Sequence, residues 1–277
     1  MHFTKMHGAG NDYIYINCMK EKVDNPSELS IRLSHRHFGI GSDGIILIKS
    51  SDKADFMMDI YNADGSRAKM CGNGIRCVAK YVYDHGLTDK EVIDIDTLSG
   101  VKTIALIREG NTVTGARVDM GEPVLEAAKI PVKADKSPVV DVPVSFGSGF
   151  SQMRMTCVSM GNPHAVFFAE DVDNLELAKI GPDIEKNDIF PEGVNAEFIE
   201  LTDREHIKMR VWERGSGETM ACGTGACASV VAASLNGFTE RKAEVALLGG
   251  KLTIEWEEKD NHVYMTGPAV TVFEGEV

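Results

Sequence analysis

The stretch Cys71-Gly72-Asn73-Gly74 has a second copy in this chain, Cys222-Gly223-Thr224-Gly225. The two cysteines are 222 − 71 = 151 residues apart. Three other matched positions share the offset of 151: Asn11 with Asn162, Gly44 with Asn195, and Asn62 with Glu213. A constant offset between similar motifs indicates a duplicated fold. We therefore expect two similar halves, each of which presents one cysteine.

The composition is that of an ordinary globular protein, with 277 residues, 43% hydrophobic and 26% charged. A formal net charge of −13 argues against nucleic acid or an anionic membrane surface as a partner, because both attract basic surfaces. No apolar run reaches the length of a membrane span, and the first residues lack the pattern of a secretory signal. Six cysteines without such a signal indicate free thiols in a reducing compartment, so we expect a cytoplasmic protein.

Most of the chain has the pattern of β-strands. Ile93–Asp96 and Ile207–Val211 alternate apolar and polar residues, with the period of two that a half-buried strand shows. Helix signals are fewer. One helix is expected to start at the cap Asn25, and a shorter counterpart is expected over Leu175–Ile180, ended by Gly181-Pro182.

Two further helices are expected directly after the cysteine motifs. The first runs until Gly86, and the second covers residues 226–235, which are apolar almost all round and should be buried on every face. We expect an α+β fold of two pseudo-symmetric duplicated domains, each a curved, mostly antiparallel sheet or barrel wrapped around a central α-helix. The expected domains are residues 1–119, to which 266–277 return, and residues 120–265, with the active site in the cleft between them.

A Cys-Gly-x-Gly turn at the start of a helix favours negative charge. The unpaired N–H groups and the helix dipole bind anions, and the glycines let the backbone bend into a nest. Cysteines at such positions have stabilised thiolates. One thiolate and one thiol can remove an α-proton from one face of a carbon and return a proton to the other. Nothing in the sequence marks a pyridoxal lysine, so we expect direct proton abstraction without a cofactor.

Other stretches of the chain, together with the two cysteine motifs, closely resemble diaminopimelate epimerases. These stretches are Lys5-Met6-His7-Gly8-Ala9-Gly10-Asn11-Asp12, Asn62-Ala63-Asp64-Gly65-Ser66, Ser159-Met160-Gly161-Asn162-Pro163-His164 and Glu213-Arg214-Gly215-Ser216-Gly217-Glu218-Thr219. The resemblance implies a pyridoxal-independent interconversion of LL- and meso-diaminopimelate, in the pathway to lysine and peptidoglycan. It also implies a homodimer.

The resemblance assigns roles to residues of both halves. Cys71 and Cys222 would be the acid/base pair, supported by His164 and Glu213. The backbone of Gly72-Asn73 and Gly223-Thr224 would hold the reacting carboxylate, and Asn11 would lie near it. The distal end of the substrate would be read by Asn62, Asn162, Asn195, Glu213 and Arg214. The chain departs from the family at Gly44, where many members have glutamine, and at Phe273, where some have a tyrosine at a dimer interface.

Other interpretations remain open. A zinc site from Cys71, Cys77, Cys222 and Cys227 lacks the short paired spacings of zinc knuckles, so no metal is expected. A redox pair of Cys71 and Cys222 is the alternative from another class. A proline or hydroxyproline racemase would share the paired cysteines but should have a more apolar pocket. A binding module would give no reason for a thiol at both nests. Cys18, Cys77, Cys157 and Cys227 are expected to be buried.

Overall fold

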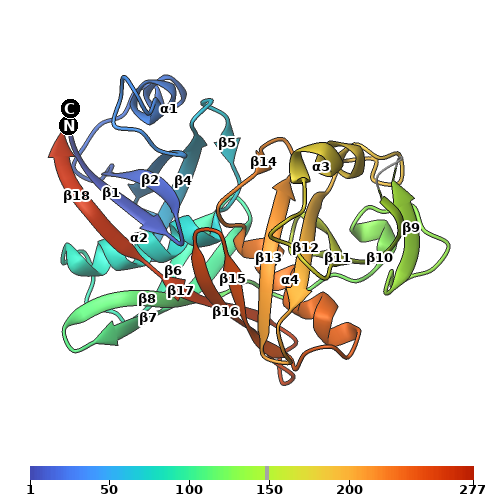
Figure 1. The fold of residues 1–277 in the computed structure, drawn as a ribbon. Coiled ribbons are helices and arrows are strands. Elements are labelled where there is room, and N and C mark those ends of the chain that lie inside the picture. Colours follow the sequence, from blue (N-terminus) through green and yellow to red (C-terminus); the bar gives the residue numbers. More distant parts are fainter. Residues whose placement is uncertain (147–149) are drawn as a thin grey trace. The chain divides into compact units, whose positions relative to one another are not determined.

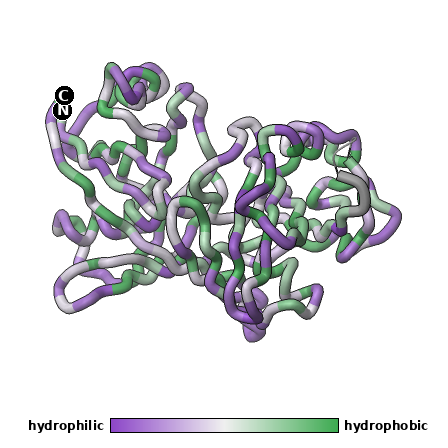
Figure 2. The backbone as a smooth tube through the Cα atoms, viewed as in Figure 1, coloured by the Kyte–Doolittle hydropathy of each residue, from purple (hydrophilic) through white to green (hydrophobic). Residues whose placement is uncertain are grey.

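The computed structural model describes residues 1–146 and 150–277. The chain divides into two compact units: Met1–Asp119 with Thr266–Val277, and Met120–Met265. We call them unit 1 and unit 2. Hydrophobic and hydrophilic stretches are interspersed along the backbone of both units (Figure 2). Burial alternates with a period of two in strands 92–97 and 206–213, as in half-buried strands, whereas strands 44–49 and 163–168 are buried over nearly their whole length.

Unit 1 consists of nine complete strands and two helices within the described residues. In chain order they are β1 (His2–Gly8), β2 (Asn11–Asn17), α1 (Pro26–Ser34), β3 (Gly44–Lys49), β4 (Phe56–Asn62), β5 (Arg67–Ala68), α2 (Gly72–Asp84), β6 (Val92–Thr97), β7 (Gly100–Glu109), β8 (Thr112–Asp119) and, after unit 2, β18 (Val270–Glu276). β18 pairs antiparallel with β1, which brings the C-terminal strand beside the first strand (Figure 1).

Unit 2 repeats this order. Its elements are the short 3-10 helix η1 (Ala127–Lys129), β9 (Val142–Phe146), β10 (Phe150–Ser159), β11 (Pro163–Phe168), α3 (Leu177–Glu185), β12 (Asn195–Leu201), β13 (His206–Glu213), β14 (Gly217–Glu218), α4 (Gly223–Leu235), β15 (Lys242–Leu247), β16 (Gly250–Trp256) and the first half of β17 (Val263–Pro268). Among the strand pairs whose register is described, most are antiparallel, and the parallel ones are β2–β3 and β4–β6 in unit 1 and β11–β12 and β13–β15 in unit 2.

The duplication extends to helix ends and strand register. Helix α2 starts at residue 72 and α4 at residue 223, so 223 − 72 = 151, and both have 13 residues. Opposite β3, Tyr13 pairs with Gly44, and opposite β12, His164 pairs with Asn195, which is the same pairing moved by 151 residues. The expectation of two duplicated α+β halves is confirmed.

Each unit has one helix at its centre. α2 packs against β1, β2 and β8, and α4 packs against β10, β11 and β16 (Figure 1). All residues of α4 except Thr224, Ser234 and Leu235 are buried. A helix covered on nearly every side must be surrounded by its sheet, so the expectation of central helices after the cysteine motifs is confirmed.

The expected helix after Asn25 is also present. The side chain of Asn25 accepts a hydrogen bond from the backbone N–H of Glu28, and Pro26 occupies the first helical position of α1. A side-chain acceptor at the N-cap satisfies an otherwise unpaired donor, and proline costs nothing at that position.

The predicted end of the helix over Leu175–Ile180 is wrong. Helix α3 continues through Gly181 and Pro182 to Glu185 although Pro182 has no N–H to donate. A Cβ atom on Gly181 would lie 2.3 Å from the ring of Trp212, so the helix backbone lies directly against this indole. The buried face that continues past the proline consists of Leu177, Ile180, Gly181 and Ile184. Burial of this face compensates for the missing hydrogen bond.

Candidate active site

Cys71 is the N-cap residue of α2. Its Sγ atom accepts a hydrogen bond from the backbone N–H of Gly74 at 3.3 Å and lies 3.1 Å from Oδ1 of Asn11, to which a thiol would donate. Nδ2 of Asn11 donates to Asp43 at 2.7 Å, which fixes the orientation of the amide. The N-terminus of α2 therefore holds a half-buried thiol between a helix N–H group and a side-chain oxygen.

The backbone of this nest is held by Arg76, which is fully buried. Its guanidinium donates to the carbonyl of Gly72 at 3.1 Å, to Oδ1 of Asn73 at 2.9 Å and to the carbonyl of Pro268 at 3.1 Å. The buried cation thus fixes Gly72 and Asn73, the two residues that the resemblance assigns to the carboxylate.

The other expected residues of unit 1 lie where β3 and β4 pair. Gly44 is opposite Asn62, and Nδ2 of Asn62 donates to Oγ of Ser66 at 3.0 Å. A Cβ atom on Gly44 would lie 2.1 Å from the carbonyl oxygen of Tyr61. This backbone has no room for a glutamine side chain, so any ligand contact at Gly44 is made by its backbone.

Cys222 is the N-cap residue of α4 but is placed differently from Cys71. Its side chain is 5% exposed, accepts no capping hydrogen bond, and lies 3.6 Å from Oγ1 of Thr224. Burial raises the pKa of the Cys222 thiol well above its usual range, and the carboxylates of Glu213 and Glu197 raise it further. The Thr224 hydroxyl and the Gly225 N–H act in the opposite direction. The two nests therefore share a backbone plan and differ in electrostatics.

A chain of polar side chains extends inward from Thr224. Its Oγ1 accepts from Nδ2 of Asn162 at 3.3 Å, and Oδ1 of Asn162 lies 3.0 Å from Nε2 of His164. Nδ1 of His164 lies 2.7 Å from Oε1 of Glu197, and both side chains are fully buried. Asn162, His164, Thr224 and Cys222 thus belong to one connected network in unit 2.

The remaining expected residues of unit 2 lie at the ends of β12 and β13. Oε1 of Glu213 accepts a hydrogen bond from the Thr219 hydroxyl. The buried Asn195 accepts from the backbone N–H of Arg214 at 2.9 Å and donates to the carbonyl of Pro163 at 2.9 Å. The exposed Arg214 side chain donates to the carbonyl of Glu192 at 2.8 Å. Asn195 therefore ties the Pro163 turn to the Glu213-Arg214 turn through its amide.

Three of the cysteines expected to be buried are so: Cys77, Cys157 and Cys227 are inaccessible to solvent. Cys18 is only half-buried, because it follows the end of β2 on a turn. In the described parts of the chain, no three His, Cys, Asp or Glu side chains come together as metal ligands. No helix there is both long and apolar enough to cross a membrane.

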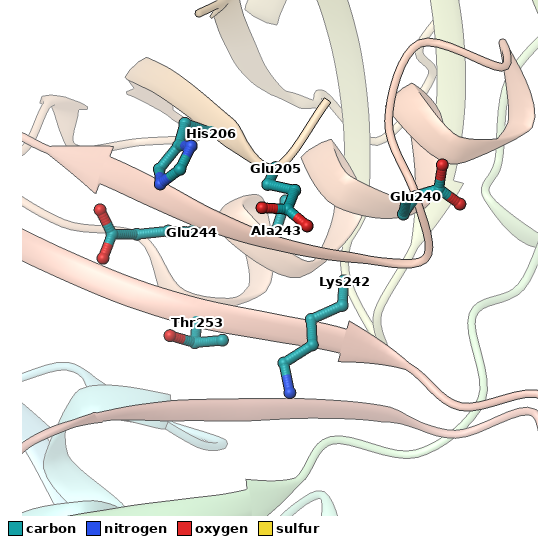
Figure 3. A pocket seen from close by; sticks show the side chains of 7 residues that line it. All are labelled: Glu205, His206, Glu240, Lys242, Ala243, Glu244 and Thr253. Carbon is teal, nitrogen blue, oxygen red and sulfur yellow. The ribbon is translucent and has the colours of Figure 1, made fainter. Parts of the chain in front are cut away.

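A separate surface depression lies on unit 2 at the starts of β13 and β15 (Figure 3). Its lining residues are Glu205, His206, Glu240, Lys242, Ala243, Glu244 and Thr253. None of them belongs to the cysteine motifs. Four of the lining residues form surface ion pairs, for example His206 with Asp203 at 2.9 Å and Glu244 with Lys251 at 2.7 Å. This depression is a solvated charged surface.

Comparison with known proteins gives one consistent result. A family profile described as diaminopimelate epimerase matches residues 3–126 and 156–272. A diaminopimelate epimerase of Acetivibrio thermocellus is 58% identical over 277 residues, covering 100% of this chain and 98% of the relative. One of Methanococcus maripaludis strain C5 is 56% identical, covering 100% and 99%. The chain belongs to the diaminopimelate epimerase family. It is an epimerase, as the resemblance in the sequence implied.

The fold is shared more widely than the family. The crystal structure of a hydroxyproline epimerase from Agrobacterium vitis with bound trans-4-hydroxy-L-proline matches with a TM-score of 0.67 at 14% identity, covering 100% of this chain and 90% of that one. Identity at this level shows the common fold alone. The choice between diaminopimelate and proline chemistry therefore rests on the family and not on the shape.

Three polar residues next to the motifs of this family member were not expected from the sequence. The first is Tyr13, which the offset identifies as the position equivalent to His164, because 13 + 151 = 164. Asp43, which holds Asn11, lies beside a recognised glycine. Glu197 is the one charged residue in the buried stretch 194–199. A charged residue within an apolar strand pattern indicates a functional or paired group and could have identified Glu197. Its counterpart at 197 − 151 = 46 is Ile46.

Proposed function

We propose that this epimerase interconverts LL- and meso-diaminopimelate, and that Cys71 and Cys222 exchange the α-proton without a cofactor. The observation that carries the proposal is the duplication of the thiol position: each unit begins its central helix at a cysteine N-cap, with the same offset as the fold itself. The relatives that cover the whole chain are named diaminopimelate epimerases.

The proposed reaction balances within the two thiols and the substrate. The thiolate of one cysteine takes the α-proton, so the C–H bond breaks, an S–H bond forms, and the electron pair remains on the α-carbon. The second thiol then gives its proton to the opposite face of that carbon. The reverse direction exchanges the roles. Because the two groups act in turn as acid and base, each must reach one face of the same carbon.

The proposed task of the two nests is to stabilise the charge of this carbanion. The N–H groups of Gly72-Asn73 and Gly223-Thr224 lie at the first turns of α2 and α4, where unpaired donors and the helix dipole favour a carboxylate. Donors fixed before the reaction cost no reorganisation when charge develops. Arg76 supports this proposal, since it holds both residues of the first nest.

For the distal amino-acid end of the substrate we propose Asn62, Asn162, Asn195, Glu213 and Arg214, and for the reacting end Asn11. The link through Asn195 supports the assignment, because it holds the backbone of Arg214 to the turn that carries Asn162. His164 and Glu213 are proposed to support the thiols. The carboxylate of Glu213 acts on the thiol of Cys222 directly, and His164 acts through Asn162 and Thr224.

We also propose that the protein is a cytoplasmic homodimer. Reactive thiols need a reducing compartment, and the chain has six cysteines. Strand β18 exposes hydrophobic side chains of Val270, Val272 and Phe273, with Phe273 47% exposed while its ring packs edge-on against Phe3. Exposed apolar residues grouped on one strand suit a contact between copies.

The test is an activity measurement with the reduced protein and no added cofactor. LL-diaminopimelate, L-proline and trans-4-hydroxy-L-proline are incubated separately, and the stereoisomers are separated by chiral chromatography. Meso-diaminopimelate should form and the two cyclic amino acids should remain unchanged. Turnover of a cyclic amino acid without turnover of diaminopimelate would refute the substrate assignment, and activity that depends on pyridoxal phosphate would refute the mechanism.

A further inference from the structure

Unit 2 contains a buried histidine–glutamate pair, His164 and Glu197, that has no counterpart in unit 1. Nδ1 of His164 is 2.7 Å from Oε1 of Glu197, and neither side chain is exposed to solvent. At the corresponding positions of unit 1 the chain has Tyr13 and Ile46. A Cβ atom on Gly225 would lie 2.6 Å from Oε1 of Glu197 and 3.2 Å from Sγ of Cys222. The carboxyl group therefore lies directly under the nest of the second thiol.

The hydrogen bonds around His164 decide where its protons are. Nδ2 of Asn162 donates to Thr224, which leaves Oδ1 of Asn162 facing Nε2 of His164 at 3.0 Å. An amide oxygen only accepts, so Nε2 carries a hydrogen. A neutral imidazole has a single N–H, and Nδ1 would then be bare. A bare nitrogen 2.7 Å from a carboxylate oxygen is repulsive, so one further proton lies between His164 and Glu197.

The charge of the pair leads to the same arrangement. With the shared proton, the pair is uncharged overall, as imidazolium with carboxylate or as imidazole with carboxylic acid. Without it, the amide of Asn162 must turn round, and a net negative charge is buried beside Glu213. Burying an unpaired charge is costly. Among residues 1–146 and 150–277, nothing hydrogen-bonds to Oε2 of Glu197, so that charge would lack compensation.

We propose that Glu197 and His164 hold one shared proton as an uncharged pair, and that Glu197 is thereby a positioning residue for Cys222. It keeps the Nε2–H of His164 on Asn162, and Asn162 in turn keeps its Nδ2 on Thr224 beside the thiol. The positioning role in catalysis rests on the proposed function. The shared proton of His164 and Glu197 is inferred from hydrogen bonds alone and does not depend on that function.

The titratable groups around the pair agree with this assignment. Burial raises the pKa of Glu197, while His164 lowers it and Glu213, at the end of β13, raises it. On β10, burial raises the pKa of Cys157 beyond the physiological range, and on α4 burial raises that of Cys222, so both are neutral thiols when the pair is uncharged. Glu213 is the one other carboxylate among the causes that act on Glu197.

The first test counts charges. Replacing an ionised glutamate by glutamine makes a protein one charge unit more positive, which native capillary electrophoresis at pH 8 resolves. The control Glu258→Gln, at an exposed carboxylate, should show this shift. Glu197→Gln should migrate with the wild type, because an uncharged pair is replaced by an uncharged pair. The same one-unit shift in both variants would overturn the proposal.

The second test needs no variant. In the wild-type protein labelled with ¹⁵N-histidine, the Nε2 atom of His164 should carry hydrogen at every pH from 6 to 8.5. Hydrogen on Nδ1 with a bare Nε2 would overturn the proposal, even if Glu197→Gln does not fold.

The positioning role is tested by activity. Glu197→Leu should lower kcat roughly 10- to 100-fold, because small displacements of catalytic groups have effects of this size. Glu197→Gln should recover most of that loss, since its amide N–H can donate to Nδ1 of a neutral His164. Wild-type kcat in Glu197→Leu would refute the positioning role. A wild-type protein without epimerase activity would instead refute the proposed function and leave the charge and NMR results valid.

Discussion

The Sγ atom of Cys71 lies 3.1 Å from Oδ1 of Asn11 at the start of one central helix, whereas the Sγ atom of Cys222, at the start of the other, lies 3.6 Å from the Thr224 hydroxyl. The two thiols occupy equivalent places in a duplicated fold and have different partners. Cys71 is half-buried and hydrogen-bonded to an amide, whereas Cys222 is buried near two carboxylates. A symmetric backbone thus supports an asymmetric pair of acid/base groups.

We expect Asn11→Ala to make Cys71 more reactive and the enzyme less active. The variant removes the acceptor of the thiol hydrogen, which favours the thiolate by about 1 kcal/mol, or roughly fivefold in alkylation rate. It also removes a group proposed to lie near the substrate, so kcat/KM should fall. Alkylation is followed by mass spectrometry of the Cys71 peptide, with the Cys18 peptide as an internal control. Slower alkylation of Cys71 would contradict the assigned hydrogen bond.

Cys71→Ser and Cys222→Ser should each lower kcat at least ~100-fold without unfolding the protein. A hydroxyl is far less acidic than a thiol, and the loss of one positioned acid/base group costs roughly 10²–10⁴-fold. Serine is also a favourable N-cap, so α2 and α4 should remain stable. The control Cys18→Ser, outside both nests, should keep wild-type kcat. Substantial activity in either nest variant would show that the missing thiol is not an acid/base group.

Glu213→Gln should move the alkylation of Cys222 to lower pH. The Glu213 carboxylate raises the pKa of this thiol, and its removal lowers that pKa, so the thiolate appears earlier as the pH rises. At a pH below both values we expect a rate increase of about tenfold for a change of one pKa unit. Glu197→Gln should have a smaller effect, because that pair is already uncharged. An unchanged pH profile in Glu213→Gln would remove Glu213 from the environment of Cys222.

Gly225→Ala should destabilise the protein more than Gly74→Ala, although the two glycines are equivalent. The added methyl group would meet Oε1 of Glu197 at 2.6 Å in one case and Cδ1 of Ile46 at 2.6 Å in the other. The Ile46 methyl can rotate away, whereas Glu197 is held by His164. We expect a loss of about 1–3 kcal/mol for Gly225→Ala and under about 1 kcal/mol for Gly74→Ala, measured by urea unfolding. Equal losses would mean that Glu197 is free to move.

Phe273→Asp should convert the proposed dimer to monomers, because it places a charge among the exposed apolar residues of β18. Sedimentation velocity of the two proteins at equal concentration measures the change. Phe273→Tyr is the control and should remain dimeric. A wild-type protein that sediments as a monomer would refute the dimer.

Much of the fold could be predicted because the duplication is written into the sequence. The cysteine motifs, the cap at Asn25 and the apolar segment 226–235 each have a local physical cause. The end of helix α3 could not be predicted, because local rules place the end of a helix before Pro182 and do not include the packing of Gly181 on Trp212. The end of this helix is set by a contact between residues far apart in the sequence.

The site was less predictable at the positions where the two halves differ. Asn11, Asn162 and the two nests follow from matched motifs. Glu197 does not, because its counterpart Ile46 is apolar and the motif comparison searches for likeness. Its importance arises from burial and from the hydrogen bond to His164, which are properties of the folded chain.

The central claim, a proton exchange between two thiols, is tested most directly by the fate of the α-hydrogen. LL-diaminopimelate is incubated with the reduced protein in D₂O, and substrate and product are separated at low conversion and analysed by mass spectrometry. Two bases predict meso product with one solvent deuterium at the inverted carbon, while recovered substrate still carries its original hydrogen. Product that retains the original hydrogen, or no meso product at all, would contradict the account.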